Sequence, residues 1–115
     1  MNDGKDVFTL MDEIKLPANL EVGEGYGRLT WSIRGIYEGY AGWFDGNPAT
    51  MYAAPQSSAF SDLVKLAGGP DKVAQLAMER VARGEFVEAL HLTDAALAAD
   101  PHHTNSLEVR LQALQ

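Results

Sequence analysis

The stretch GYGRLTWSIRGIYEGYAGWFDGNPA, residues 25–49, decides the fold of this chain. At 100° per residue it predicts one helix of about four or five turns, which stops at the turn sequence Asp45-Gly46-Asn47-Pro48. One broad side of the predicted helix is apolar, and we expect this side to face a core. Its residues are Tyr26, Leu29, Ile33, Ile36, Tyr37, Tyr40, Trp43 and Phe44.

Three glycines form a row on a different side of the same predicted helix. Gly35, Gly39 and Gly42 recur at i, i+4 and i+7, and Trp31 lies beside the row. Each glycine inside a helix costs roughly 1 kcal/mol relative to alanine, a cost carried more readily where another backbone must come close. The pattern therefore predicts a second covered side. Its neighbour is left open among another helix of this domain, another domain and a second copy.

Composition narrows the classes of partner. The chain has 115 residues, enough for one domain with a real core, and a formal net charge of −7, which argues against nucleic acid and anionic membranes. Without cysteine it has no disulfide, thiolate metal site or cysteine nucleophile. We see no signal peptide and no apolar run near the ~20 residues of a membrane span. We expect a soluble protein and leave cytoplasm and periplasm open.

The remaining residues predict an all-α fold of about six helices. Residues 1–24 read as a helix capped by Asp6, which ends before Pro17, and a connector. Residues 25–115 read as the main domain. A third helix is expected from Pro55. Its predicted buried face is Phe60, Leu63, Val64 and Leu66.

Residues 70–115 have the regular pattern of a helical hairpin followed by one more helix. The segment resembles a tetratricopeptide repeat, which has a period of ~34 residues. The resemblance is carried by Leu76, Ala77, Gly84, Phe86, Ala89, Ala96 and Pro101, and it departs at Val73, Arg80 and Thr93. We expect the last helix to bury Leu107, Leu111 and Leu114, and the long central helix to pack on this hairpin. One repeat cannot form a solenoid alone.

No catalytic constellation is visible in the sequence. His91, His102 and His103 lack the spacing of a zinc hydrolase; we interpret the last two as surface residues and His91 as structural. Residues 23–27, G-x-G-x-G, do not match the dinucleotide fingerprint, and no G-x-S-x-G is present. We therefore predict no catalytic residue, no metal and no cofactor in this chain.

The segment YGRLTWSIRGIYEGYAGWFDGNPATMY, residues 26–52, resembles the dimerisation domain of alkyl sulfatases. The matching residues are Tyr26, Gly27, Leu29, Arg34, Ile36, Tyr37, Tyr40, Gly42, Trp43, Phe44, Asp45, Gly46, Asn47 and Pro48. Thr30, Trp31 and Ser32 depart from the Ser-His-Asn of many members. The resemblance extends from about Val7 onward. It implies a zinc-dependent parent hydrolase with a metallo-β-lactamase-like catalytic domain, joined through residues 1–24. Both zinc and that domain are absent from this chain.

The resemblance implies a non-catalytic module that holds a homodimer together and adjoins the parent's catalytic domain. The candidate dimer or domain interface is Tyr26, Trp31, Gly35, Gly39, Gly42, Trp43 and Phe44. An alternative is a repeat-like binding module for a peptide or an apolar ligand, which needs a deep groove. An enzyme in its own right is a third hypothesis, which the missing nucleophile and metal ligands disfavour.

Overall fold

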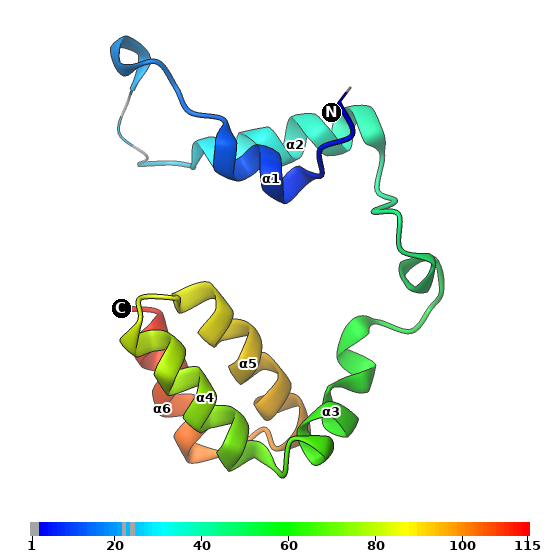
Figure 1. Ribbon diagram of the computed structural model, residues 1–115, viewed down its shortest axis with the longest axis vertical. Helices are drawn as coiled ribbons and strands as arrows, with labels where there is room; N and C mark the ends of the chain where they lie inside the picture. Colours follow the sequence, from blue (N-terminus) through cyan, green and yellow to red (C-terminus); the bar gives the residue numbers. More distant parts are fainter. Residues whose placement is uncertain (1–2, 22, 24) are drawn as a thin grey trace. The chain divides into compact units, whose positions relative to one another are not determined.

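A computed structural model describes residues 3–21, 23 and 25–115 (Figure 1). The described residues form α-helices and short 3-10 turns, with no strand among them, so the all-α prediction is confirmed. The chain divides into two compact units, Met1–Asn47 and Pro48–Gln115, each of which is described by itself. The helices are α1 (Val7–Glu13), α2 (Leu29–Ala41), α3 (Phe60–Leu66), α4 (Pro70–Ala82), α5 (Phe86–Ala99) and α6 (Thr104–Ala113). The 3-10 turns are η1 (Ala18–Leu20), η2 (Pro48–Met51) and η3 (Gln56–Ala59).

The first unit consists of α1 lying along α2 (Figure 1). Helix α1 begins at the predicted cap, because the carboxylate of Asp6 accepts the backbone N–H groups of Phe8 and Thr9 at 2.9 and 3.0 Å. It ends at Ile14, whose backbone is extended. Arg34 and Glu38 on α2 form an i, i+4 ion pair, with 2.8 Å between Nε and Oε1.

Helix α2 is shorter than the sequence pattern predicts. It begins after the extended residue Arg28 and ends at Gly42, whose N–H bonds the carbonyl of Glu38 at 2.9 Å. Gly42 has a φ of +78°, a backbone conformation that residues other than glycine rarely adopt. It therefore ends the helix and is not a third glycine within it. Placing Gly42 in that row was therefore wrong. The predicted apolar side was also too long, since Tyr26, Trp43 and Phe44 lie outside α2.

The second unit packs α4, α5 and α6 together and places α3 against α5 (Figure 1). Helices α3 and α4 are separated at Gly68-Gly69-Pro70, where the two glycines have φ of +93° and +110° and Pro70 opens α4. Small residues stand where the helices cross, which lets the backbones approach closely. The buried clusters are Val64, Val73 and Ala96, and Ala77, Ala89 and Val109.

Two predicted buried faces are wrong in the second unit. On α3, Val64 is buried against Val73 and Ala96, but Leu63 and Leu66 are exposed. On α6, the buried residues are Ser106 and Val109, and the predicted stripe is exposed. That stripe is Leu107, Leu111 and Leu114, and Leu76 of α4 is also partly exposed.

The predicted helical hairpin is present as α4 and α5, followed by the single helix α6. Its likeness to a tetratricopeptide repeat stays a prediction. The expected packing of α2 on this hairpin would join the two units, and it also stays a prediction. Within the first unit, α2 contacts α1.

Candidate functional site

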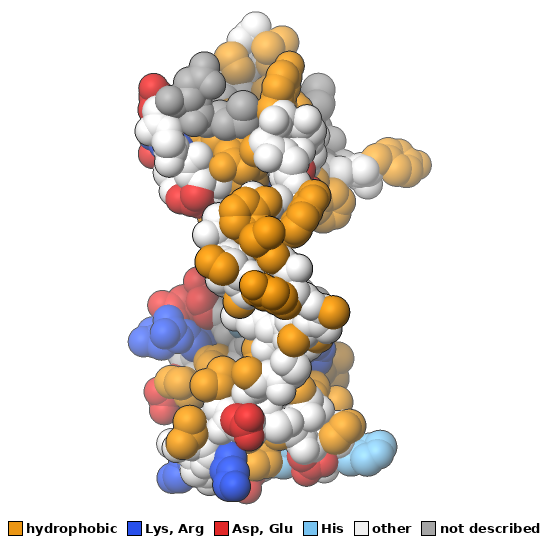
Figure 2. Space-filling view, turned by 90° about the vertical axis from the view of Figure 1, so that its right-hand side faces the viewer, with side chains coloured by type: hydrophobic (Ala, Val, Ile, Leu, Met, Phe, Trp, Pro, Cys, Tyr) orange, Lys and Arg blue, Asp and Glu red, His pale blue; other side chains and the backbone are white. Residues whose placement is uncertain are grey.

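The first unit carries a large apolar surface and almost no core. Ile33 is the one buried side chain among its described residues, at 7% exposure. Figure 2 shows large hydrophobic side chains standing at the surface of this unit. We call the following exposed residues the apolar surface of the first unit: Phe8, Ile14, Leu16, Leu20, Tyr26, Trp31, Ile36, Tyr40, Trp43 and Phe44.

This imbalance has an energetic meaning. Burying one isoleucine side chain contributes about 1.5–3 kcal/mol. Isolated helices shorter than about 12–15 residues are marginal in water. The contact between α1 and α2 alone therefore does not account for the stability of the first unit.

An apolar groove runs between α1 and α2. Its volume is about 390 Å³, and its floor includes the buried Ile33. Ile36 and Tyr40 stand at its rim with 62% and 80% of their surface exposed. The lining residues are Leu10, Ile14, Leu29, Ser32, Ile33, Ile36, Tyr37 and Tyr40. A groove of this composition suits apolar side chains better than a polar ligand.

Gly35 and Gly39 lie one turn apart on α2 and are uncovered. A methyl group placed on either glycine would meet no atom of the described chain within 4 Å. A neighbouring helix of the same unit therefore does not explain them, because α1 leaves this side of α2 open. The backbone of α2 is bare here, as a close helix crossing requires.

The aromatic members of the predicted interface lie around α2. Trp43 and Phe44 contact each other edge to face after the end of the helix, with ring centroids 6.1 Å apart. A side chain added at Gly27 would lie 3.9 Å from Cε3 of Trp31, so this ring stands beside the start of the helix. Tyr26 is fully exposed. The structure therefore brings Trp43 and Phe44 together and leaves Tyr26 apart from contacts of this kind.

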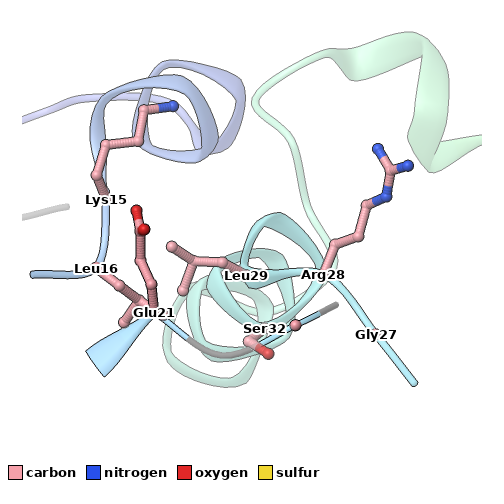
Figure 3. A pocket seen from close by; sticks show the side chains of 8 residues that line it. Lys15, Leu16, Glu21, Gly27, Arg28, Leu29 and Ser32 are labelled. Carbon is pink, nitrogen blue, oxygen red and sulfur yellow. The ribbon is translucent and has the colours of Figure 1, made fainter. Parts of the chain in front are cut away.

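A wider groove lies at the start of α2, with a volume of about 750 Å³ (Figure 3). The side chains of Leu16 and Leu29 lie near Glu21, whereas Lys15 and Arg28 stand at opposite margins with their terminal nitrogens far apart (Figure 3). Because the two cations do not converge on one point, this groove offers no built site for an anion. We take it as a further hollow in the apolar surface.

One triad in the second unit has the connectivity of a hydrolase site. The Nδ1 atom of His103 lies 2.8 Å from the hydroxyl of Ser106, and its Nε2 atom lies 3.1 Å from Oδ1 of Asp71. Ser106 is completely buried, so no substrate carbonyl could reach its hydroxyl. The backbone N–H of Ser106 also donates to Nδ1 at 3.3 Å, which makes His103 the cap of α6. The triad is structural.

The triad corrects the interpretation of two histidines. Only 13% of the side chain of His103 is exposed, so describing it as a plain surface residue was wrong. The position of His103 just before the start of a helix could have indicated a capping role, because N-cap residues occupy this position. His91, interpreted as structural, lies exposed on α5.

The described residues of the second unit hold no cluster of metal-binding side chains. No three acidic, histidine or cysteine side chains come together in the described part of the chain. The donor set that zinc needs is therefore not assembled by the described residues. The groove between α4 and α6 holds about 200 Å³ and is lined largely by polar residues such as Asp71, Gln75 and Glu108. No helix within the described ranges is long and apolar enough to cross a membrane.

Comparisons with known proteins give a consistent result. The family model described as alkyl sulfatase dimerisation matches residues 8–115. A linear primary-alkylsulfatase of Pseudomonas is 34% identical over 105 residues, which are 87% of this chain and 20% of that protein. The alkyl/aryl-sulfatase BDS1 of Saccharomyces cerevisiae is 27% identical over 119 residues, which span all of this chain and 18% of that protein.

Solved structures agree with these matches. The stereoselective inverting sec-alkylsulfatase Pisa1 from Pseudomonas superposes with a TM-score of 0.86 at 28% identity, covering 99% of this chain and 19% of that one. The chain thus spans about a fifth of the length of the relatives it matches.

Proposed function

We propose, because this chain belongs to the alkyl sulfatase dimerisation family, that it joins two copies of a longer alkylsulfatase-like hydrolase into a homodimer. The observation that supports the proposal is the apolar surface of the first unit, which the helices of that unit leave exposed around a single buried side chain. Activity, substrate and zinc would belong to a metallo-β-lactamase-like catalytic domain outside these residues.

The size of the apolar surface supports a stable dimer. One aromatic side chain carries about 150–250 Å², so the exposed residues together offer on the order of 1,000 Å² of apolar area. A standard interface buries about 800 Å² on each partner. The exposed tryptophans and tyrosines are also the side chains that most often dominate binding. The surface is therefore large enough, and of the right composition, for a second copy.

We place the dimer contact on the side of α2 that carries Gly35 and Gly39. In a two-fold dimer the same patch faces itself, and bare backbones let two helices cross closely. Trp31 stands near this patch, and Tyr26, Trp43 and Phe44 flank the two ends of the helix. Gly42 follows the end of α2, and its positive φ gives it a second role as the residue that stops the helix.

The direct test is the mass of the chain in solution, measured by sedimentation velocity from low to high micromolar concentration. We expect a reversible monomer–dimer equilibrium. A well-folded monomer at every concentration would overturn the proposal.

A substitution sharpens the test, because a monomer and a dimer should respond to it in opposite directions: the monomer should gain stability and the dimer should weaken. In Gly35→Leu the new Cβ lies in open space beside the first unit, and the substitution improves helix propensity by about 1 kcal/mol. A monomeric chain should become more stable. A dimer that crosses at this glycine should weaken by about tenfold or more, equivalent to roughly 1.4 kcal/mol. Gly25→Leu is the matched control, since Gly25 lies before α2 and also faces open space.

A further inference from the structure

The two units differ sharply in how much core they contain. In the second unit every long helix contributes buried side chains, and α6 is tied to its neighbours by His103 and by an ion pair between Arg110 and Asp94. The buried residues there are Val64, Val73, Ala74, Ala77, Ala89, Thr93, Ala96, Ser106 and Val109. The described residues of the first unit bury Ile33 alone.

We infer that the first unit folds only as a second copy covers it, so that folding of Met1–Asn47 and dimerisation are a single step, whereas Pro48–Gln115 folds as a monomer. Besides Ile33, the described part of the unit has only partly buried apolar side chains such as Leu10 and Leu29, a small core to set against the conformational entropy of ordering α1 and α2. Gly35 and Gly39 lower the intrinsic stability of α2 further. The missing stabilisation must come from outside the unit.

The occupant is a second copy of this chain, and in this respect the inference rests on the proposed function. The exposed apolar area matches what one partner contributes to a standard dimer, and the family model that matches the chain is described as a dimerisation domain. Two local interactions favour helix formation in the first unit before a partner binds. The cap at Asp6 and the ion pair between Arg34 and Glu38 favour helix without needing a core.

Coupled folding has a consequence for assembly. A segment that orders on binding spends part of its contact energy on ordering, so the dimer should be weaker than its buried area suggests. It should also be sensitive to any change that alters the helicity of residues 29–41 in the free chain. Separate monomers should expose residues 3–47 as an unfolded segment attached to a folded second unit.

Amide hydrogen exchange on the full chain, read by mass spectrometry across the dimer dissociation range, tests the inference. Above the dissociation constant, peptides from α2 and from α5 should both be protected. Below it, protection in α2 should fall by at least a hundredfold, while α5 keeps its protection. Protection in α2 that does not change as the dimer dissociates would overturn the inference and leave the proposed dimer intact.

Gly35→Leu separates coupled folding from simple docking. At a concentration where the unaltered chain is dimeric, this variant should be monomeric and should have lost protection in α2, although leucine is the better helix former. Gly25→Leu should keep both the dimer and the protection. A monomeric Gly35→Leu chain whose α2 stays protected would overturn coupled folding. A chain without substitutions that never dimerises would overturn the proposed function and this inference together.

Discussion

The Nε2 atom of His103 lies 3.1 Å from Oδ1 of Asp71, a contact that joins the start of α6 to the first turn of α4. The same carboxylate oxygen accepts the side-chain N–H of Asn105 at 3.0 Å. On its other side, the ring of His103 accepts the backbone N–H of Ser106. One imidazole therefore caps a helix and braces two helices that are distant in the sequence.

Replacing this imidazole should destabilise the second unit. His103→Ala removes a helix cap and a side-chain contact, and we expect a loss of about 1–2 kcal/mol in the free energy of unfolding. Urea unfolding followed by far-UV circular dichroism measures it. His103→Asn can still cap the helix and should lose less.

His102→Ala is the matched control, because the neighbouring His102 is exposed and lies outside α6. Equal unfolding midpoints for His103→Ala and His102→Ala would contradict the bracing role.

Sequence patterns located the helices of the second unit well, because residues at the helix ends themselves determine where these helices begin and end. Glycine and proline at 68–70 and Pro101 act through the backbone of their own residues. The rotation of α6 was not predictable in the same way. Leu107 and Leu111 look like a core stripe, but Val109 packs with Ala77 of α4 and Ala89 of α5, which places Ser106 and Val109 on the inner side of α6. These partners lie in other helices.

The candidate interface stays a prediction, but the structure separates the three glycines assigned to it. In the sequence, Gly35, Gly39 and Gly42 recur at helical spacing, and nothing in that spacing shows which of them lie inside the helix. The backbone separates them, because Gly42 has a positive φ and ends the helix, whereas the other two lie inside it. Only the family motif suggested a dimer, because the pattern of apolar residues in a sequence does not show which side chains a partner covers.

Close helix packing in the second unit gives a second prediction. Ala77 is completely buried and clusters with Ala89 and Val109. In Ala77→Leu the added methylene and methyl groups have no space, and overpacking typically costs about 1–3 kcal/mol. Ala82→Leu, at the exposed end of the same helix, adds the same atoms without this contact. Chemical unfolding of both variants should show a lower midpoint for Ala77→Leu alone, and equal midpoints would show that the crossing tolerates larger side chains.

The end of α2 gives a third prediction. Gly42 combines a φ of +78° with a ψ of −173°, a conformation that is essentially restricted to glycine. Gly42→Ala should therefore cost about 1–3 kcal/mol in the folded first unit, which would appear as weaker dimerisation. Gly25→Ala is the control, because no positive φ is found at Gly25. Sedimentation of both variants provides the measurement, and unchanged association of Gly42→Ala would mean that the chain can leave α2 by another route.

The cap of α1 gives a prediction about pH. Hydrogen bonds from the hydroxyl and the backbone N–H of Thr9, joined by that of Phe8, lower the pKa of the exposed Asp6 carboxyl below its ordinary value. Because the folded pKa is lowered, the stabilising effect is complete above the ordinary value of about 3.9 and is lost as the pH falls through the lowered pKa. Amide protection in α1 of the dimer should decline over that acidic range. Asp6→Asn should still cap the helix but remove this part of the pH dependence, since an amide does not titrate there. If both chains lost protection in α1 along the same pH curve, the carboxylate of Asp6 would not be the group that holds the start of the helix.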